Sequence, residues 1–213
     1  MPRSVANRSA SAQAPSEWAQ KRRVVSAQSW FAPAVWFGAY TGARRGETLA
    51  VRWRDLDLEQ QAVTIRQSLT ETKVGGLQFK ETKNRKRRTI TLPPSLVHIL
   101  HRHRAEQDRD REFFGSAYKD DDLVFAAPDG SPVAPWTFTA SFRYLVQRSK
   151  VTHIRLHDLR DTHASLLGKH GVPLEVVSKR LGHESIAITA ERYLHVYRER
   201  DAEAAAVFER VAS

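Results

Sequence analysis

Four side chains that suit phosphate chemistry stand in the last third of the sequence. His157 and Arg160 are three positions apart, a spacing that places both on one face of a helix. His183 follows within Leu-Gly-His, and Tyr193 comes ten positions later. A guanidinium holds phosphate oxygens through paired donors, imidazoles move protons, and a phenol beside them can act as a nucleophile. These residue types therefore predict a tyrosine that attacks a phosphate.

Another arginine belongs to the same hypothesis. Arg44 lies in the segment TGARRGE at positions 41–47, between two expected helices, where a helix N-terminus favours anions. Taken alone, Arg44 would be an ordinary surface arginine. Glu47 would be either its buried partner or an acidic residue in the first turn of a helix. The segment gains meaning only in combination with the later histidines, arginine and tyrosine.

The elements that must position these residues are mostly helices. Apolar periodicity, with proline at starts and glycine at ends, predicts helices over 29–40, 45–53, 96–112, 136–149, 157–170, 173–181, 185–194 and 198–211. Alternating apolar residues between turns predict strands over 62–66, 77–80 and 88–92. We expect these three strands to form one small antiparallel sheet, with positions 84–86 at a hairpin tip, and 55–57 to form a turn. The fold class is therefore α+β. Residues 29–213 form one domain after a linker or disordered stretch over 1–28.

Composition narrows the class of partner. Lys and Arg number 34 and Asp and Glu 24, so the net charge is +10 and the pI is about 10.2. Such an excess favours a polyanion such as nucleic acid, although a basic ribosomal protein would look the same. The absence of cysteine excludes disulfides, thiolate catalysis and cysteine-ligated zinc. No apolar run is long enough for a membrane span or a secretion signal, so we expect a cytoplasmic protein without a membrane partner.

Three stretches carry a family resemblance. They are TGARRGETLAVRWRDLDL, LHDLRDTHASLL and LGHESIAITAERYLHV. In order and spacing they resemble the signature boxes of the tyrosine recombinase (phage integrase) family, over about Trp30 to Val196. The resemblance implies the mostly helical catalytic fold of DNA breaking-rejoining enzymes. It also implies a catalytic set consisting of Arg44, His157, Arg160, His183 and the nucleophile Tyr193.

The family also places a lysine on a β-hairpin between the first two boxes. Within FKETKNRKRRTITL the best match is Lys83, because related hairpins read Lys-Thr at this place. Here Asn84 follows, and the hairpin is about one residue short. Lys80 and Lys86 therefore stay as alternatives.

Other basic residues and histidines have simpler interpretations. The basic residues Arg85, Lys86, Arg87 and Arg88 are expected to form a solvated hairpin tip, or to touch phosphates where DNA lies beside them. The segment 101–104 is expected to be a solvated face of its helix. The histidines at 157, 163, 183 and 195 could form a metal site, but the neighbouring arginine would repel a cation. We therefore expect no metal and no other cofactor.

The resemblance implies a reaction and a set of partners. The expected function is site-specific recombination of double-stranded DNA through a 3′-phosphotyrosyl intermediate, in the integration or excision of a phage or other mobile element. A homotetramer on DNA is implied, and accessory DNA-bending proteins are compatible with it. Positive charge near the phenol, whose ordinary pKa is about 10, should favour phenolate.

Alternative functions stay open at this point. Integrases of this kind usually carry an N-terminal helical DNA-binding domain, whereas only about 28 residues precede the expected catalytic domain here. The sequence is therefore expected to be an isolated domain, a fragment or a truncated remnant. A DNA-binding partner without turnover and a type IB topoisomerase are the alternatives.

Overall fold

The structure is a computed structural model that describes residues 30–72, 74–81, 87–149, 152–198 and 201–212. Its helices are α2 (Phe31–Thr41), α3 (Arg45–Thr48), α4 (Pro94–Phe114), α5 (Pro135–Arg148), α6 (Asp158–Lys169), α7 (Leu174–Leu181), α8 (Ile186–Arg198) and α9 (Asp201–Ala212). Short 3-10 turns, η1 and η3, lie at Trp53–Asp55 and Gly115–Ala117. The strands are β1 (Leu56–Asp57), β2 (Ala62–Ile65), β3 (Gln67–Thr72), β4 (Gly76–Glu81) and β5 (Arg88–Thr91). The α+β class with a small antiparallel sheet is confirmed.

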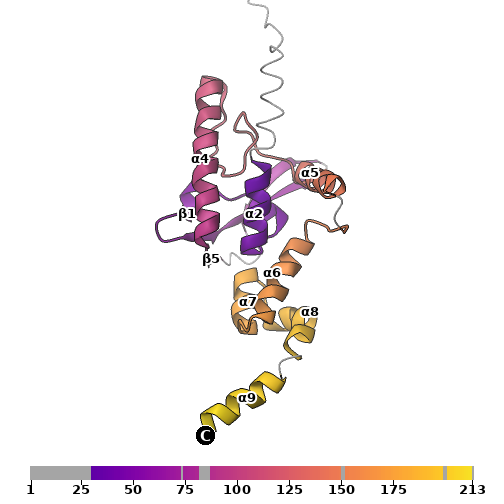
Figure 1. Ribbon diagram of the computed structural model, residues 1–213. Coiled ribbons are helices and arrows are strands. Elements are labelled where there is room, and N and C mark those ends of the chain that lie inside the picture. Colours follow the sequence, from indigo (N-terminus) through magenta and orange to yellow (C-terminus); the bar gives the residue numbers. More distant parts are fainter. Residues whose placement is uncertain (1–29, 73, 82–86, 150–151, 199–200, 213) are drawn as a thin grey trace, which may run out of the picture.

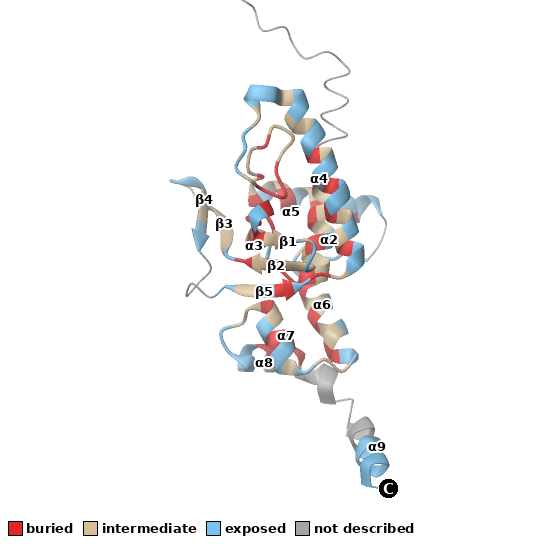
Figure 2. Ribbon diagram, turned by 90° about the vertical axis from the view of Figure 1, so that its left-hand side faces the viewer, coloured by how far each residue is buried: buried red, intermediate tan, exposed pale blue. Residues whose placement is uncertain are grey.

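The elements gather into two groups (Figure 1). One contains α2, α4, α5 and the strands, and the other contains α6, α7 and α8. Helix α9 extends away from both groups, and its described side chains are exposed, including Val207, Phe208 and Val211 (Figure 2).

The strands form two sheets. One is three-stranded and antiparallel in the order β1-β2-β5, with Val63 opposite both Leu56 and Ile90. The other is the β3–β4 hairpin, in which Leu69 pairs with Phe79. The predicted membership of the three-stranded sheet was therefore wrong. The strand expected over 77–80 lies in the hairpin, and its place is taken by β1, which was expected to be a turn.

Arg66 is the single residue between β2 and β3, which belong to different sheets. The Arg66 guanidinium lies 2.8 Å from the carboxylate of Asp55, which is buried in η1. Strand β3 begins directly afterwards. It was not predicted because its sequence, QSLTET, is polar and buries only Leu69.

One apolar core joins α2, α4 and the three-stranded sheet. Its fully buried members include Phe37, Leu49, Val63, Ile90, Leu92, Leu96, Leu100 and Phe125. The core also contains a polar strip: the Trp53 indole donates to Gln107 at 2.6 Å, and Gln107 donates to the Leu123 carbonyl at 2.9 Å. His103 is buried beside it, with Nε2 at 2.6 Å from the Val124 carbonyl oxygen. The expectation of a solvated face at 101–104 is therefore wrong at His103.

The two groups of elements meet closely at a glycine. Gly42 ends α2 with φ of +66°, a conformation that L side chains rarely adopt. A Cβ at Gly42 would lie 2.7 Å from the side chain of Leu181 and 2.9 Å from that of His163. The absence of a side chain therefore lets the end of α2 approach α6 and α7, and this approach assembles the site described next.

Candidate active site

The turn after α2 presents Arg44. The Thr41 hydroxyl donates to the Phe37 carbonyl at 2.6 Å and accepts from the Ala43 amide at 3.2 Å, which holds the turn in shape. Arg44 then precedes α3, where its amide and its guanidinium donate to the Glu47 carboxylate at 2.8 and 3.0 Å. The Arg44 side chain stays 46% exposed. Arg44 is therefore fixed at its base and accessible at its tip.

Glu47 provides the carboxylate that holds the Arg44 turn in place. It is buried and also accepts two hydrogen bonds from Arg88 of β5, at 2.7 and 3.1 Å. Burial alone would raise the pKa of the Glu47 carboxyl, but hydrogen bonds and positive charge from Arg88 and Arg44 hold that pKa below its usual value. Arg88 also donates to the Arg180 carbonyl at 2.9 Å. The pair thus connects α3, β5 and α7. The expectation of a solvated tip is therefore wrong at Arg88, whose side chain is only 9% exposed because it pairs with Glu47.

Arg160 joins the Arg44 turn to the end of α7. The residue is 3% exposed, and its guanidinium donates to the carbonyls of Gly42 and Leu181. Burial, with repulsion from Arg44 and Arg88, lowers the pKa of Arg160 to about 10, so it remains charged at neutral pH. The acceptor of this hydrogen bond, Leu181, lies only two residues before His183 in the chain.

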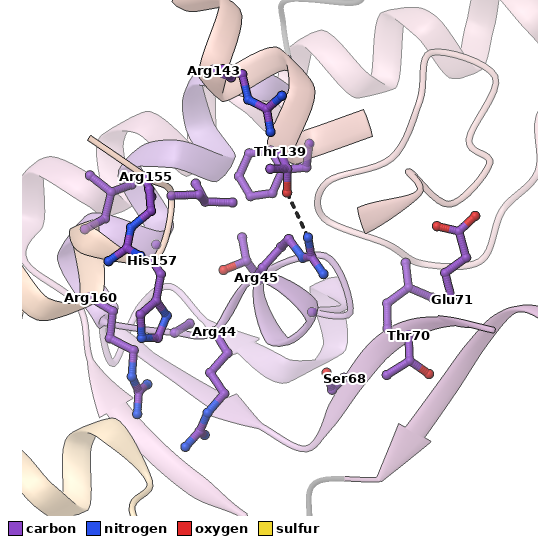
Figure 3. Close-up of a pocket in the computed structure, with 18 residues that line it drawn as sticks. Arg44, Arg45, Ser68, Thr70, Glu71, Thr139, Arg143, Arg155, His157 and Arg160 are labelled. Atoms are coloured by element: carbon purple, nitrogen blue, oxygen red, sulfur yellow. Dashed lines mark hydrogen bonds between the residues drawn. The ribbon is translucent and has the colours of Figure 1, made fainter. Parts of the chain in front are cut away.

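His157 lies next to these arginines. It caps α6 as an exposed side chain, and its Nε2 is 3.4 Å from the Arg192 guanidinium of α8. Figure 3 shows Arg44, from the turn after α2, and His157 and Arg160, from the start of α6, extending toward the same side of a pocket. The convergence predicted for these three residues is therefore present in the structure.

His183 follows α7 and is neutral. Its Nδ1 is 2.7 Å from the hydroxyl of Thr189, which is fully buried in α8. Burial and the positive charges of Arg160 and Arg44 lower the pKa of His183 to about 4. As a neutral imidazole, His183 can still donate one hydrogen bond or accept one, according to its tautomer. Thr189 was not singled out from the sequence, because no motif marks a helical threonine as a histidine partner.

Tyr193 is held between α6, α7 and α8. The residue is 2% exposed and packs with Ala164, Val177 and Leu181. Its hydroxyl donates to the Asp161 carboxylate at 2.6 Å. Burial and Asp161 raise the pKa of Tyr193 to about 12, although Arg192 and Arg160 oppose the change. Positive charge from these arginines thus favours phenolate, as expected, but burial and the Asp161 carboxylate, neither of which was predicted for Tyr193, outweigh it.

A pocket of about 720 Å³ lies between α3, β3, α5 and the start of α6. Besides Arg44, His157 and Arg160, it is lined by Arg45, Arg143 and Arg155. Arg45 donates to the Thr139 hydroxyl at 2.8 Å, across from α3 to α5 (Figure 3). These three basic residues were not predicted. The Arg-Arg pair at 44–45 was a usable signal, whereas Arg143 stands in no motif.

The structure does not test which lysine of the hairpin belongs to the site. Lys83, Arg85 and Lys86 lie outside the described residues, and Arg87 is exposed just before β5. The alternative Lys80 is on β4 opposite Ser68, a residue that lines the pocket.

The histidines considered for a metal have other partners. His163 accepts a hydrogen bond from Arg180 at Nε2 (3.1 Å), and its Nδ1 is 3.0 Å from the Ala39 carbonyl oxygen. The side chain of His195 lies outside the described part of α8. Among the side chains that are described, no group of three or more His, Asp or Glu is arranged to hold a metal ion. Across the described helices, none has both the length and the apolar character needed to cross a bilayer.

The sequence matches the model of the phage integrase family over residues 20–200. The chain belongs to this family. It is 32% identical over 169 residues to a tyrosine recombinase XerC-like protein of Caldanaerobacter subterraneus subsp. tengcongensis, covering 73% of this chain and 43% of that protein. It is also 32% identical over 169 residues to the ICEBs1 integrase of Bacillus subtilis, covering 78% and 45%. The chain thus spans less than half the length of these relatives.

Solved structures share the fold. The Tn1549 transposon integrase in complex with transposon right end DNA matches with a TM-score of 0.70 at 18% identity, over 98% of this chain and 69% of that one. The catalytic domain of bacteriophage HP1 integrase matches with a TM-score of 0.55 at 20% identity, over 91% and 95%. At these identities the likeness establishes the fold alone.

Proposed function

We propose that residues 29–213 form the catalytic domain of a site-specific DNA recombinase that acts on a phage or other mobile element. The observation that supports this most directly is that Arg44, His157 and Arg160 line one pocket, while His183 and Tyr193 lie close enough to Arg160 for its charge to act on both. Membership of the phage integrase family supports the same conclusion.

The proposed reaction needs no external energy source. The Tyr193 oxygen bonds to the scissile phosphorus, the bond from phosphorus to the 5′ oxygen breaks, and the phenol loses its proton. The 5′ oxygen gains a proton and leaves as a hydroxyl. The 3′-phosphotyrosyl bond keeps the free energy of the phosphodiester, so a 5′ hydroxyl from a partner strand can reverse the attack.

The charged residues would act on the phosphate. Arg44 has an exposed guanidinium, and Arg160 brings a second positive charge into a buried setting where electrostatic interactions are strong. Both suit the extra negative charge that develops on the non-bridging oxygens. His157 and neutral His183 can donate to the same oxygens or carry a proton.

We assign the leaving-group proton to Lys83. An ammonium can release a proton to the departing 5′ oxygen, whereas an arginine holds its proton too tightly. Arg88, anchored by Glu47, ties the first residue of β5 to the active-site corner, only five positions after Lys83. Lys80 and Lys86 remain alternatives that single substitutions would separate.

Double-stranded DNA is the proposed substrate. The chain carries a net charge of +10, and six cationic or imidazole side chains line one pocket. Arg45, Arg143 and Arg155 would contact phosphates that flank the scissile one, as Arg85, Lys86 and Arg87 would from the hairpin. We further propose a homotetramer on DNA, in which the exposed apolar face of α9 packs on a neighbouring copy. Accessory DNA-bending proteins would assist where the site needs them.

A covalent-adduct assay tests the proposal. The substrate is DNA from the junctions of the element that encodes the chain, nicked near the exchange point so that the cleaved product cannot be religated. We expect a protein–DNA adduct with the wild type and none with Tyr193→Phe. Tyr118→Phe is a matched control, because Tyr118 lies against Arg111, outside the proposed site. An undiminished adduct with Tyr193→Phe would rule out this nucleophile.

The hydrogen bond of Tyr193 also favours a second candidate function. A tyrosine held neutral by a carboxylate would suit a protein that occupies DNA without cutting it. In that case DNA binding would weaken with rising salt while no adduct forms on any nicked substrate.

A further inference from the structure

Asp161 is the hydrogen-bond partner of the Tyr193 hydroxyl, although no step of the proposed reaction requires this carboxylate. It lies on α6, one residue after Arg160 and one helical turn after His157. Its carboxylate accepts the Tyr193 hydroxyl at 2.6 Å and lies 3.6 Å from the Arg192 guanidinium. Arg192 in turn reaches Nε2 of His157. The carboxylate therefore contacts the proposed nucleophile directly and is connected to His157 through Arg192.

Apolar packing holds the Tyr193 ring, and a carboxylate binds its hydroxyl. The ring packs with Ala164 of α6 and with Val177 and Leu181 of α7, while the hydroxyl donates to Asp161. A carboxylate that accepts this hydrogen bond requires the phenol to keep its proton. A phenolate in the same place would face a like charge at 2.6 Å.

We propose that Asp161 is a positioning residue that holds Tyr193 as a neutral phenol in the free protein and must release it before attack. This inference rests on the proposed recombinase function. It assigns Asp161 to the control of the nucleophile and not to the binding of the phosphate.

The surrounding charges are consistent with this role. Arg160 from α6 and Arg192 from α8 both favour phenolate, whereas the contacts from α7 are apolar. Burial and the hydrogen bond from Asp161 nevertheless outweigh the two arginines and raise the pKa of Tyr193 to about 12. Asp161 is 32% exposed at its side chain, so the groups of an incoming substrate can compete for it.

A titration tests the contact without any DNA. The protein is labelled with ¹³C at the tyrosine Cζ position, and the Tyr193 resonance is identified by its absence in Tyr193→Phe. In the wild type we expect this resonance to remain that of a phenol up to about pH 11, while circular dichroism confirms the fold. In Asp161→Asn, which can accept the hydrogen bond but carries no charge, we expect the pKa to fall by about one unit or more.

Asp158→Asn is the matched control. Asp158 lies on the same helix but pairs with Arg155, so its removal should leave the titration of Tyr193 unchanged. The proposal is overturned if Tyr193 titrates alike in the wild type and Asp161→Asn.

The adduct assay then distinguishes two roles for Asp161, which are holding the Tyr193 phenol and accepting its proton. If Asp161 holds the phenol, Asp161→Asn should form adducts faster at neutral pH, about tenfold for each unit by which the pKa falls. A loss of a hundredfold or more, despite the lower pKa, would identify Asp161 as the proton acceptor and overturn the holding role. If no variant, the wild type included, forms an adduct while the titration behaves as expected, the recombinase function fails and the contact with Asp161 stands.

Discussion

Arg88 and Glu47, 41 positions apart, form a buried ion pair directly beneath Arg44. The two guanidinium–carboxylate contacts measure 2.7 and 3.1 Å, and Glu47 also binds the amide and side chain of Arg44. One carboxylate therefore fixes two arginines from two elements. Any change at Glu47 should affect both the stability of the fold and the placement of Arg44.

Glu47→Gln should destabilise the protein by about 3 kcal/mol, because it leaves the buried Arg88 guanidinium without its countercharge. Urea unfolding followed by circular dichroism at pH 7 measures this loss. Asp108→Asn is the matched control, since Asp108 and Arg111 form a partly exposed pair that should contribute well under 1 kcal/mol. A loss for Glu47→Gln as small as that of the control would contradict the structural role of the pair.

The same variant should flatten the dependence of stability on pH. The pKa of Glu47 is lower in the folded protein than its ordinary value of 4.5. Its contribution is therefore complete above about pH 5 and is lost as the pH falls through the folded-state pKa. The wild type should approach the stability of Glu47→Gln as the pH is lowered from 5 to 3. A constant difference across that range would argue against the ion pair.

Much of the secondary structure around the candidate site could be predicted from the sequence, because glycine and proline residues mark where its helices end and begin. Gly171 and Gly182 take positive φ of 82° and 66°, and Pro173 precedes α7, as their places in the sequence suggested. The helix expected over 173–181 accordingly differs from α7 by a single residue at its start. The residues named for catalysis were proposed from their types, their spacing and the family resemblance, and their catalytic roles stay predictions.

Interactions between distant segments could not be predicted in the same way. Asp161 was quoted within a motif but had no assigned partner, because its contact with Tyr193 depends on how α8 packs on α6. Strand β3 is polar and forms because β4 pairs with it. Its sequence lacks the alternation of apolar residues that predicts a strand. His103 was a different kind of error. It follows Leu96 and Leu100 at helical spacing, so the buried stripe was visible in the sequence.

His163 should remain neutral at pH 6, with its proton on Nδ1. Its Nε2 accepts from Arg180, so Nδ1 must donate to the Ala39 carbonyl. Burial and the nearby Arg180 lower the pKa of His163 to about 4, from an ordinary value of 6.5. Long-range ¹H–¹⁵N spectra of the imidazole ring report both the charge and the tautomer. A protonated ring at pH 6, or a proton on Nε2, would contradict this assignment.

The low pKa of His163 also implies that the protein is less stable in acid. Between pH 6.5 and 4 the unfolded chain binds a proton that the folded protein does not, so stability should fall as the pH falls through this window. Because the ring is only partly buried, we expect a loss on the order of 2 kcal/mol. His163→Asn should be less stable at pH 7 but should lack this component of the pH dependence. Equal slopes for the two proteins would exclude His163 as its source.

Thr189 should determine the placement of the His183 ring. Thr189→Val keeps the shape of the side chain but removes the hydroxyl that lies 2.7 Å from Nδ1. Loss of an orienting hydrogen bond of about 1.4 kcal/mol corresponds to a tenfold slower formation of the DNA adduct. Thr189→Ser should restore the rate. Imidazole ¹⁵N shifts should show a changed tautomer balance in the valine variant alone, and unchanged shifts would place the effect elsewhere.

Arg45 and Arg143 should contribute to DNA affinity without contributing to sequence preference. Both line the pocket that contains Arg44 and Arg160, and both are exposed. If each neutralises one phosphate, replacement by glutamine should lower the slope of log K against log salt by about 0.9 for each arginine. The double variant should therefore lose about 1.8 in slope, with similar losses on specific and unrelated DNA.

Arg109→Gln serves as the control for this measurement, because Arg109 is an exposed arginine of α4 that bonds to the Ala105 carbonyl of its own helix. It removes the same charge from the chain but from a different surface. If the protein's net charge alone governs binding, Arg109→Gln will reduce affinity as much as Arg45→Gln or Arg143→Gln does. A reduction confined to the two pocket arginines would instead place the DNA backbone along the pocket, next to the phosphate that Tyr193 is proposed to attack.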